Sequence, residues 1–382
     1  MRWLCLWVVA SVIVIASSSA AIEAECYGVE HPCFSPDGRT IIFASDHDGN
    51  LDLYRIGSNG SGLRRLTDGE AYYSRPVFSQ DGRYIACERS DFKGNDAVMV
   101  TNADGSNPHV ITKGKSSQWA PAWLPNGKGL IVVTSGEQSP DLLLITSSGD
   151  TKGYVARNAV QEGSPSCSPD GSWVAYEVVD DSQGLNGDQM QVHICKRSLA
   201  GAARPPVQLT SGRIDRNPRI SPKGDRIVYA GSQGAVWVMK SDGSGSARVP
   251  AGDGQALDPC WSPNGTQIAF VKSMDIENHE ITNRDVYMVS LKGTGLTQVT
   301  HTVARARFSS EARTYPGTQT VTITCDSPGA IIRYTTDGSN PTKASPLYSK
   351  PILVDHSLTL KARAWKTDWF PSHVKSAQYV MK

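Results

Sequence analysis

Pro32-Cys33-Phe34-Ser35-Pro36-Asp37-Gly38 is the first of six near-copies of one short phrase in this chain. The other five copies begin at Pro76, Pro121, Pro165, Pro218 and Pro259, and each ends on a glycine. The leading prolines lie 44, 45, 44, 53 and 41 residues apart, and a period in this range is typical of stacked supersecondary units. The phrase itself predicts a turn, because Pro fixes φ, Asp or Asn bonds its own backbone, and Gly adopts positive φ.

Each repeat phrase is followed by short apolar patterns that predict strands. After the first phrase these are residues 40–44 and 51–56, then a glycine-rich turn at 59–62 and a short strand at 65–67. Together with the strand around the phrase, this makes four strands in each period, which is one blade of a β-propeller. The sequence therefore predicts an all-β chain whose main domain is a six-bladed β-propeller.

The repeat also resembles a known family. Phe43-Ala44-Ser45-Asp46-His47-Asp48-Gly49-Asn50-Leu51-Asp52-Leu53-Tyr54, followed by residues 59–67, is similar to the repeat of TolB-type propellers, and the similarity extends over residues 26–300. The resemblance implies the propeller fold. It does not fix a function, because such propellers serve as binding platforms, enzyme cores and gating domains. TolB itself has an additional α/β domain before the propeller, for which we expect no room in this chain.

After Thr300 the period stops, and strand patterns of another type begin. The stretch Tyr334-Thr335-Thr336-Asp337-Gly338-Ser339-Asn340-Pro341-Thr342 resembles the C-terminal domain of chitobiases and β-hexosaminidases. This resemblance implies a small immunoglobulin-like β-sandwich that acts as an accessory module, since the catalytic residues of those enzymes lie in a separate barrel. We expect Trp365 in the core of the sandwich, and Trp369 and Phe370 exposed in a turn.

The N-terminus has the pattern of a secretory signal: Arg2, an apolar run from Leu4 to Ala16, and small residues up to Ala21. We expect residues 1–21 to be a signal peptide, 22–302 the propeller and 303–382 the sandwich, in an exported protein that is periplasmic or extracellular. No later stretch predicts a membrane span. The 38 basic and 37 acidic residues are nearly balanced, which argues against a nucleic-acid partner.

Seven cysteines follow the predicted signal, and an odd number implies at least one free or intermolecular thiol. Most lie within apolar strand patterns, where Cys behaves as a small buried hydrophobe. Cys33 and Cys260 occupy the same position in the first and last repeats. If the ring closes between these repeats, the two cysteines should lie near each other.

The segments just before the repeat prolines enter the innermost strands, so in a closed propeller all six converge on one mouth of the channel. They combine flat aromatic groups with fixed polar groups, as recognition surfaces do. The candidate ligand-binding residues are Glu30, His31, Tyr72, Tyr73, Arg75, Trp119, Arg216 and Asp258. The alternative is structural: Asn217 and Asp258 in particular could bond the turns of adjacent blades together.

Catalytic and metal motifs are weak. No Gly-x-Ser-x-Gly elbow is present. The Asp46–Asp52 stretch resembles the start of a calcium loop, but position 57 is Gly where an EF-hand needs an acidic residue. We therefore expect no cofactor and no metal. The leading hypothesis is non-catalytic binding of an envelope or extracellular protein, or of a glycan. The alternative is a lyase or hydrolase acting on polysaccharide fragments, with metal assistance through His31.

Overall fold

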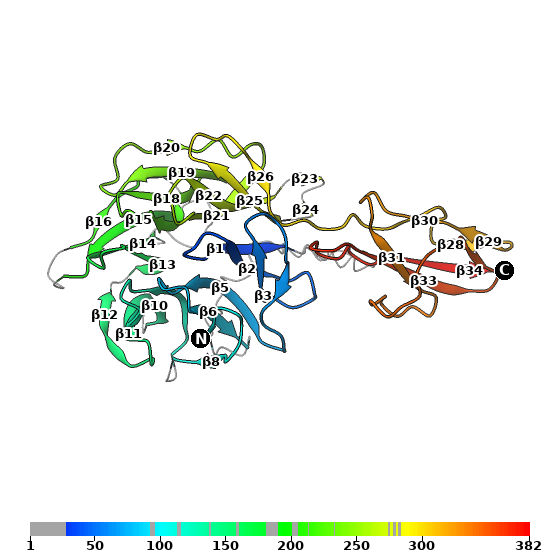
Figure 1. Ribbon diagram of the computed structural model, residues 1–382, viewed down its shortest axis with the longest axis horizontal. Helices are drawn as coiled ribbons and strands as arrows, with labels where there is room; N and C mark the ends of the chain where they lie inside the picture. Colours follow the sequence, from blue (N-terminus) through cyan, green and yellow to red (C-terminus); the bar gives the residue numbers. More distant parts are fainter. Residues whose placement is uncertain are drawn as a thin grey trace. The chain divides into compact units, whose positions relative to one another are not determined.

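The computed structural model describes residues 28–91, 96–112, 116–136, 139–157, 160–180, 190–200, 205–212, 214–232, 234–273, 276–277, 280–281 and 284–382. The predicted signal peptide and most of the long insert of the fourth repeat lie outside these residues. The chain divides into two compact units. The first contains residues up to 58 and 65–297, and the second contains 59–64 and 298–382. Every regular element among the described residues is a β-strand (Figure 1), and none is a helix of membrane-spanning length and apolarity.

The first unit contains six four-stranded antiparallel sheets, and each is formed by consecutive strands apart from a short hairpin inserted in the last. The first strands are β1 (Val29–Phe34), β5 (Tyr72–Phe78), β9 (Gln118–Trp123), β13 (Gln161–Cys167), β17 (Arg216–Ile220) and β21 (Gln255–Trp261). The second strands are β2 (Thr40–Ser45), β6 (Tyr84–Ser90), β10 (Gly129–Ser135), β14 (Trp173–Asp180), β18 (Arg226–Gly231) and β22 (Gln267–Ser273).

The third strands are β3 (Asp52–Gly57), β7 (Ala97–Asn102), β11 (Pro140–Thr146), β15 (Gln191–Ser198), β19 (Ala235–Lys240) and β25 (Arg284–Ser290). The fourth strands are β4 (Arg64–Arg65), β8 (His109–Val110), β12 (Thr151–Ala156), β16 (Val207–Gln208), β20 (Ala247–Arg248) and β26 (Thr297–Gln298). The hairpin of β23 (Ile276–Glu277) and β24 (Glu280–Ile281) interrupts the last sheet. Most fourth strands are short and exposed, which leaves little free edge for unwanted pairing.

The repeat phrase forms the turn between the first two strands of each sheet. In the first sheet the Gly38 amide donates to the Ser35 carbonyl, and the Ser35 hydroxyl donates to Asp37. Gly38 has φ of 70°, a conformation that favours glycine, so the last residue of the phrase is conformationally required. The expected turn chemistry of the phrase is confirmed.

Apolar second strands fill the space between successive sheets. Ile42 and Leu53 of the first sheet pack in one cluster with Ile85 of the second, and Val228 of the fifth packs with Phe270 of the sixth. These side chains are fully or almost fully buried because they lie between successive sheets, which explains the near-continuous apolar patterns. The predicted all-β propeller architecture is confirmed, whereas closure of the ring by six blades stays a prediction.

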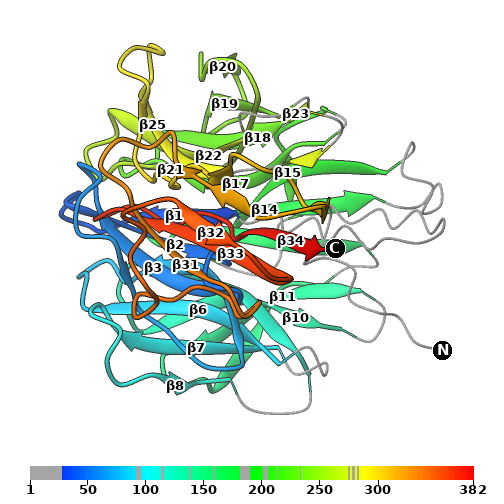
Figure 2. The ribbon, with the colours of Figure 1, turned by 90° about the vertical axis from the view of Figure 1, so that its right-hand side faces the viewer.

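The second unit is a small two-layered β domain. Its strands are β27 (Arg307–Phe308), β28 (Arg313–Tyr315), β29 (Gln319–Val321), β30 (Ile323–Thr324), β31 (Ile331–Thr335), β32 (Ile352–Val354), β33 (Leu358–Trp365) and β34 (Lys375–Met381). The main sheet has the order β28-β34-β33-β31, and Figure 2 labels three of these strands. Its core is built around Val321, Leu360 and Tyr379.

Two expectations for the second unit are wrong. Phe370 is 1% exposed, because its amide donates to the His301 carbonyl and its carbonyl accepts from Val303, which fixes the turn against the domain. Trp365 lies on the partly exposed side of β33, since the strand alternation buries Leu360, Ala362 and Ala364 instead. The expected alternation is therefore wrong by one residue at this strand.

Candidate functional site

The residue before each repeat proline adopts the same unusual backbone conformation in all six sheets. His31, Arg75, Ala120, Ser164, Asn217 and Asp258 have φ between 46° and 52°, in the left-handed region. A non-glycine residue rarely adopts this region, and a following proline further favours extended backbone, so each position is strained. The strain coincides with a β-bulge, because the register of each first strand shifts at this point.

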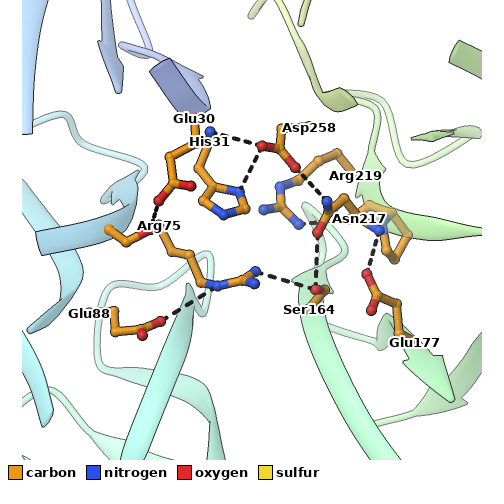
Figure 3. A network of polar contacts seen from close by, with 11 residues as sticks. Glu30, His31, Arg75, Glu88, Ser164, Glu177, Asn217, Arg219 and Asp258 are labelled. Atoms are coloured by element: carbon orange, nitrogen blue, oxygen red, sulfur yellow. Dashed lines mark hydrogen bonds and ion pairs between the residues drawn. The ribbon is translucent and has the colours of Figure 1, made fainter. Parts of the chain in front are cut away.

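We call these six residues the channel ring. The bulges direct their side chains toward one another, as Figure 3 shows for His31, Arg75, Ser164, Asn217 and Asp258. Arg75 donates to Ser164 Oγ at 3.5 Å, and Ser164 donates to Asn217 Oδ1 at 3.1 Å. Asn217 Nδ2 in turn donates to Asp258 Oδ1 at 2.5 Å. The third sheet contributes Ala120, which has no polar side chain, so Arg75 reaches past it to the fourth sheet.

Asp258 joins the last sheet to the first. Its Oδ2 accepts a hydrogen bond from the His31 amide at 3.2 Å and lies 3.4 Å from His31 Nδ1. The two residues are 227 positions apart in the sequence, so this contact requires that the repeat array return on itself. Cys33 and Cys260 follow these residues in the same strands and are free thiols. Burial raises the pKa of Cys260, and an electrostatic interaction with Cys33 adds to this shift, as expected for neighbours.

Carboxylates from neighbouring sheets satisfy the strained amides. Glu177 of β14 accepts from the Asn217 amide at 2.5 Å, and Glu88 of β6 is hydrogen-bonded by the backbone of Ala120. Glu88 also lies 3.5 Å from Arg75 Nε. Because a buried amide without an acceptor is costly, these carboxylates stabilise the bulges and orient the ring.

Burial and local charge shift the pKa values of the ring in different directions. Desolvation lowers the pKa of His31, so its ring is neutral at pH 7. Burial raises the pKa of Glu88 to about 7, although Arg75 opposes this shift. For Asp258 burial alone would raise the pKa, but His31 and Arg75 outweigh it and lower the pKa, so the carboxylate is ionised. Desolvation, with Arg75 nearby, lowers the pKa of Arg219.

The structure brings together four of the eight predicted site residues. His31, Arg75 and Asp258 belong to the channel ring, and Glu30 accepts a hydrogen bond from Ser74 in the next sheet at 2.6 Å. Tyr73, in contrast, is 9% exposed and packs in the core with Ile42 and Ile85, so it does not present its ring at a surface.

The other three predicted residues lie on the first strands at positions outside the channel ring. Trp119 is half-buried against the core between the third and fourth sheets. Tyr72 and Arg216 are the first residues of β5 and β17 and are also half-buried. Their ligand contacts stay a prediction.

Sequence reasoning missed Glu88, Glu177 and Arg219. Glu88 lies opposite Ser74 and Glu177 opposite Gly163, in second strands that are otherwise apolar. The equivalent positions of three other sheets hold Ala44, Ala230 and Val271. A carboxylate at a repeat position that is otherwise apolar therefore indicates a polar partner nearby, because a buried charge needs one.

The acidic stretch from Asp46 to Asp52 is occupied by protein partners. Asp46 accepts from the Gly28 amide, Asp48 from the Tyr54 hydroxyl, and Asp52 from Arg65 and Thr67. These contacts are those of a turn that anchors the first sheet. More generally, the described residues contain no group of three His, Cys, Asp or Glu arranged to hold a metal ion.

Comparison with known proteins identifies both units. Residues 17–152 match the family model of the TolB beta propeller domain, and residues 310–376 match that of the Chitobiase/beta-hexosaminidase C-terminal domain. The first unit is thus similar to the TolB propeller domain, and the second to the chitobiase-type C-terminal domain. It is 34% identical over 150 residues to the uncharacterized peptidase YuxL of Bacillus subtilis, which corresponds to 38% of this chain and 21% of that protein.

The chain is also 25% identical over 243 residues to the Tol-Pal system protein TolB of Francisella tularensis subsp. mediasiatica, covering 61% of this chain and 54% of TolB. It thus spans about a fifth of the peptidase and about half of TolB. Among solved structures, the hydrazine synthase of Kuenenia stuttgartiensis matches with a TM-score of 0.52 and 15% identity, over 65% of this chain and 41% of that one. This similarity concerns the fold alone.

Proposed function

We propose that the protein is an exported binding protein whose TolB propeller domain recognises a protein segment or a glycan at the mouth of its channel. The observation that supports this most is the channel ring, in which six strained residues recur at one repeat position and five bear polar side chains. Backbone strain of this kind is concentrated at functional sites. A site of fixed polar groups beside half-buried aromatic rings suits sugars and peptide segments alike.

Export and the place of action are part of this proposal. The N-terminal signal pattern supports export to the periplasm or beyond, and the similarity to TolB supports a role at the cell envelope. The C-terminal domain would then be an accessory or attachment module. Proteins or glycans of the envelope or the extracellular space are the proposed partners.

A second candidate is a lyase or hydrolase that acts on polysaccharide fragments. His31 favours it, because a neutral imidazole beside an ionised Asp258 has the arrangement of a general base. Asp258 of the ring and the neighbouring Glu177, however, already accept hydrogen bonds from the backbone of the bulges. We therefore place binding first and catalysis second.

Arg75 tests the proposed site, because it is the ring's cation and its side chain retains 24% exposure. The full chain would be screened on a glycan array and against a displayed peptide library. The affinity for the tightest-binding glycan or peptide would then be measured by calorimetry. We expect Arg75→Ala and, separately, Tyr72→Ala to weaken this binding about tenfold, the loss of one good charged or aromatic contact. Arg83→Ala, which removes an arginine with a 74% exposed side chain in the turn between β5 and β6 of the same sheet, is the matched control.

Equal affinity of all variants would contradict the proposed site. Turnover of any polysaccharide that is abolished by His31→Ala would instead support the enzymatic candidate. Melting curves of each variant distinguish lost contacts from lost folding, since Arg75 also pairs with Glu88.

A further inference from the structure

The main sheet of the C-terminal domain has one face in the core and one face outside. Ile332 and Tyr334 of β31, Leu360 and Ala362 of β33, and Ala377 and Tyr379 of β34 belong to the core. Because successive side chains of a strand point to opposite faces, the residues between them form what we call the outward face. Its members on these three strands are Ile331, Arg333, Thr335, Thr359, Lys361, Arg363, Trp365, Ser376, Gln378 and Val380.

Positive charge is concentrated on this face. Arg333 lies directly opposite Arg363 in the pairing of β31 with β33, and Lys361 lies opposite Thr335, the next outward residue along β31. Like charges directly opposite each other destabilise a sheet, so folding alone does not favour this pair. None of the outward-face positions, all within the fully described stretch 284–382, is an Asp or Glu. Asp337, just beyond Thr335, instead accepts hydrogen bonds from the Ser339 amide and hydroxyl.

Neutral oxygens hold these cations in place. Arg333 donates to the Ser345 carbonyl at 2.5 Å, Arg363 Nε to the Ser372 carbonyl at 2.9 Å, and Lys361 to Asn340 Oδ1 at 2.9 Å. Each hydrogen bond orients a cationic group. Because the acceptor oxygen is neutral, the bond itself does not neutralise the positive charge. The side chains are half-buried, so their rotamers are restricted before any ligand arrives.

An apolar pair lies beside the cations. Trp365 is directly opposite Ile331, which is 52% exposed, and the Arg363 guanidinium lies 5.7 Å from the centre of the Trp365 ring. Thr359, Ser376 and Gln378 add hydroxyl and amide groups on the same face. The face therefore combines a flat aromatic surface, three cations and several neutral hydrogen-bonding groups.

We propose that this outward face binds an acidic polysaccharide, whose carboxylate or sulfate groups pair with Arg333, Lys361 and Arg363 while a sugar ring stacks on Trp365. Charge complementarity selects an anionic ligand. The neutral hydroxyl and amide groups suit the hydroxyls of sugars, and a single aromatic ring is fewer than the successive stacking platforms that single-stranded nucleic acids use. The proposal goes beyond the function of the propeller and does not depend on what the channel ring binds.

Matched polymers test this proposal. Biolayer interferometry at two salt concentrations measures how the full chain binds immobilised carboxymethyl-dextran and unmodified dextran. We expect affinity for carboxymethyl-dextran that is at least tenfold higher and falls with salt. The double variant Arg333→Gln/Arg363→Gln should lose about tenfold or more, and Trp365→Ala about threefold to tenfold.

The controls separate this site from general charge and from the propeller. Arg307→Gln removes a 71% exposed cation of the same domain that pairs with Asp326, and Arg75→Ala alters the channel ring; both should bind carboxymethyl-dextran as the unmodified protein does. Equal binding of the two dextrans, or no effect of the outward-face variants, would overturn the proposal. Tighter binding to single-stranded DNA or to phosphatidylglycerol vesicles would also overturn it, in favour of those ligands.

Discussion

Replacing Asp258 with Ala should lower the free energy of unfolding of the propeller by about 3 to 5 kcal/mol, the usual cost of breaking a buried charge network from one side. The carboxylate accepts from the His31 amide and from Asn217 Nδ2, and Arg75 and Arg219 act on its charge. Its loss leaves the His31 amide without this acceptor and removes a negative charge that acts on Arg75 and Arg219. Urea unfolding followed by tryptophan fluorescence measures the effect.

The Asp258 contribution should also depend on pH with a definite sign. The pKa of Asp258 is lower in the folded state than in the unfolded state. Its contribution to the free energy of unfolding is therefore present above the unfolded pKa of about 4. This contribution is lost as the pH falls through the folded pKa. Asp253→Ala, at an exposed position five residues earlier, should change stability by no more than about 0.5 kcal/mol. A loss below about 1 kcal/mol for Asp258→Ala would contradict its role in the ring.

Glu88→Gln should have the opposite effect at alkaline pH and make the propeller more stable than the unmodified protein at pH 8. Burial raises the pKa of Glu88 from 4.5 to about 7, so the folded state retains a proton that the unfolded state releases. Stability of the unmodified protein therefore falls as the pH rises between these values, by on the order of 2 to 4 kcal/mol. Glutamine is neutral throughout and should remove this slope while still accepting a hydrogen bond.

Stability curves at pH 5 and pH 8 measure this difference. At pH 5 Glu88 is mostly protonated in the folded protein, so the two proteins should differ much less in stability than at pH 8. Asp46, whose pKa burial raises to about 6, remains in the variant and contributes a slope of the same sign, so the slope should decrease and not vanish. Glu70→Gln, at an exposed position, is the control. An unchanged slope in Glu88→Gln would show that Glu88 ionises normally in the folded protein.

The sequence predicted the propeller because the same local chemistry occurs six times. Pro, Asp or Asn, and Gly at fixed offsets have few alternatives to a tight turn, and the apolar residues after each turn form the buried strands. His31, Arg75 and Asp258 were predicted to converge for the same reason, since equal repeat positions occupy equal places in a propeller.

Contacts between repeats were not predictable in the same way. The left-handed conformation at His31 or Asn217 contradicts the ordinary preference of a residue before proline, and only the assembled ring compensates it. The partners Glu88 and Glu177 come from second strands of other repeats, so their roles depend on the packing of one sheet on the next. In the C-terminal domain, alternate residues of β33 face the core, and which set does so decides the place of Trp365. Composition alone does not determine which set is buried.

We expect the first and last sheets to meet, so that the six bulge residues surround one channel. A double-mutant cycle of His31→Ala and Asp258→Ala, with stability measured in urea, tests this most directly, because the cycle removes the side-chain contact between His31 Nδ1 and Asp258 Oδ2 at 3.4 Å. The two residues are 227 positions apart, so their side chains meet only if the ring closes there. The predicted result is a coupling free energy of at least about 0.5 kcal/mol, with none for the control pair His31→Ala and Asp170→Ala. Additive effects of His31→Ala and Asp258→Ala would contradict closure by six blades and the channel ring with it.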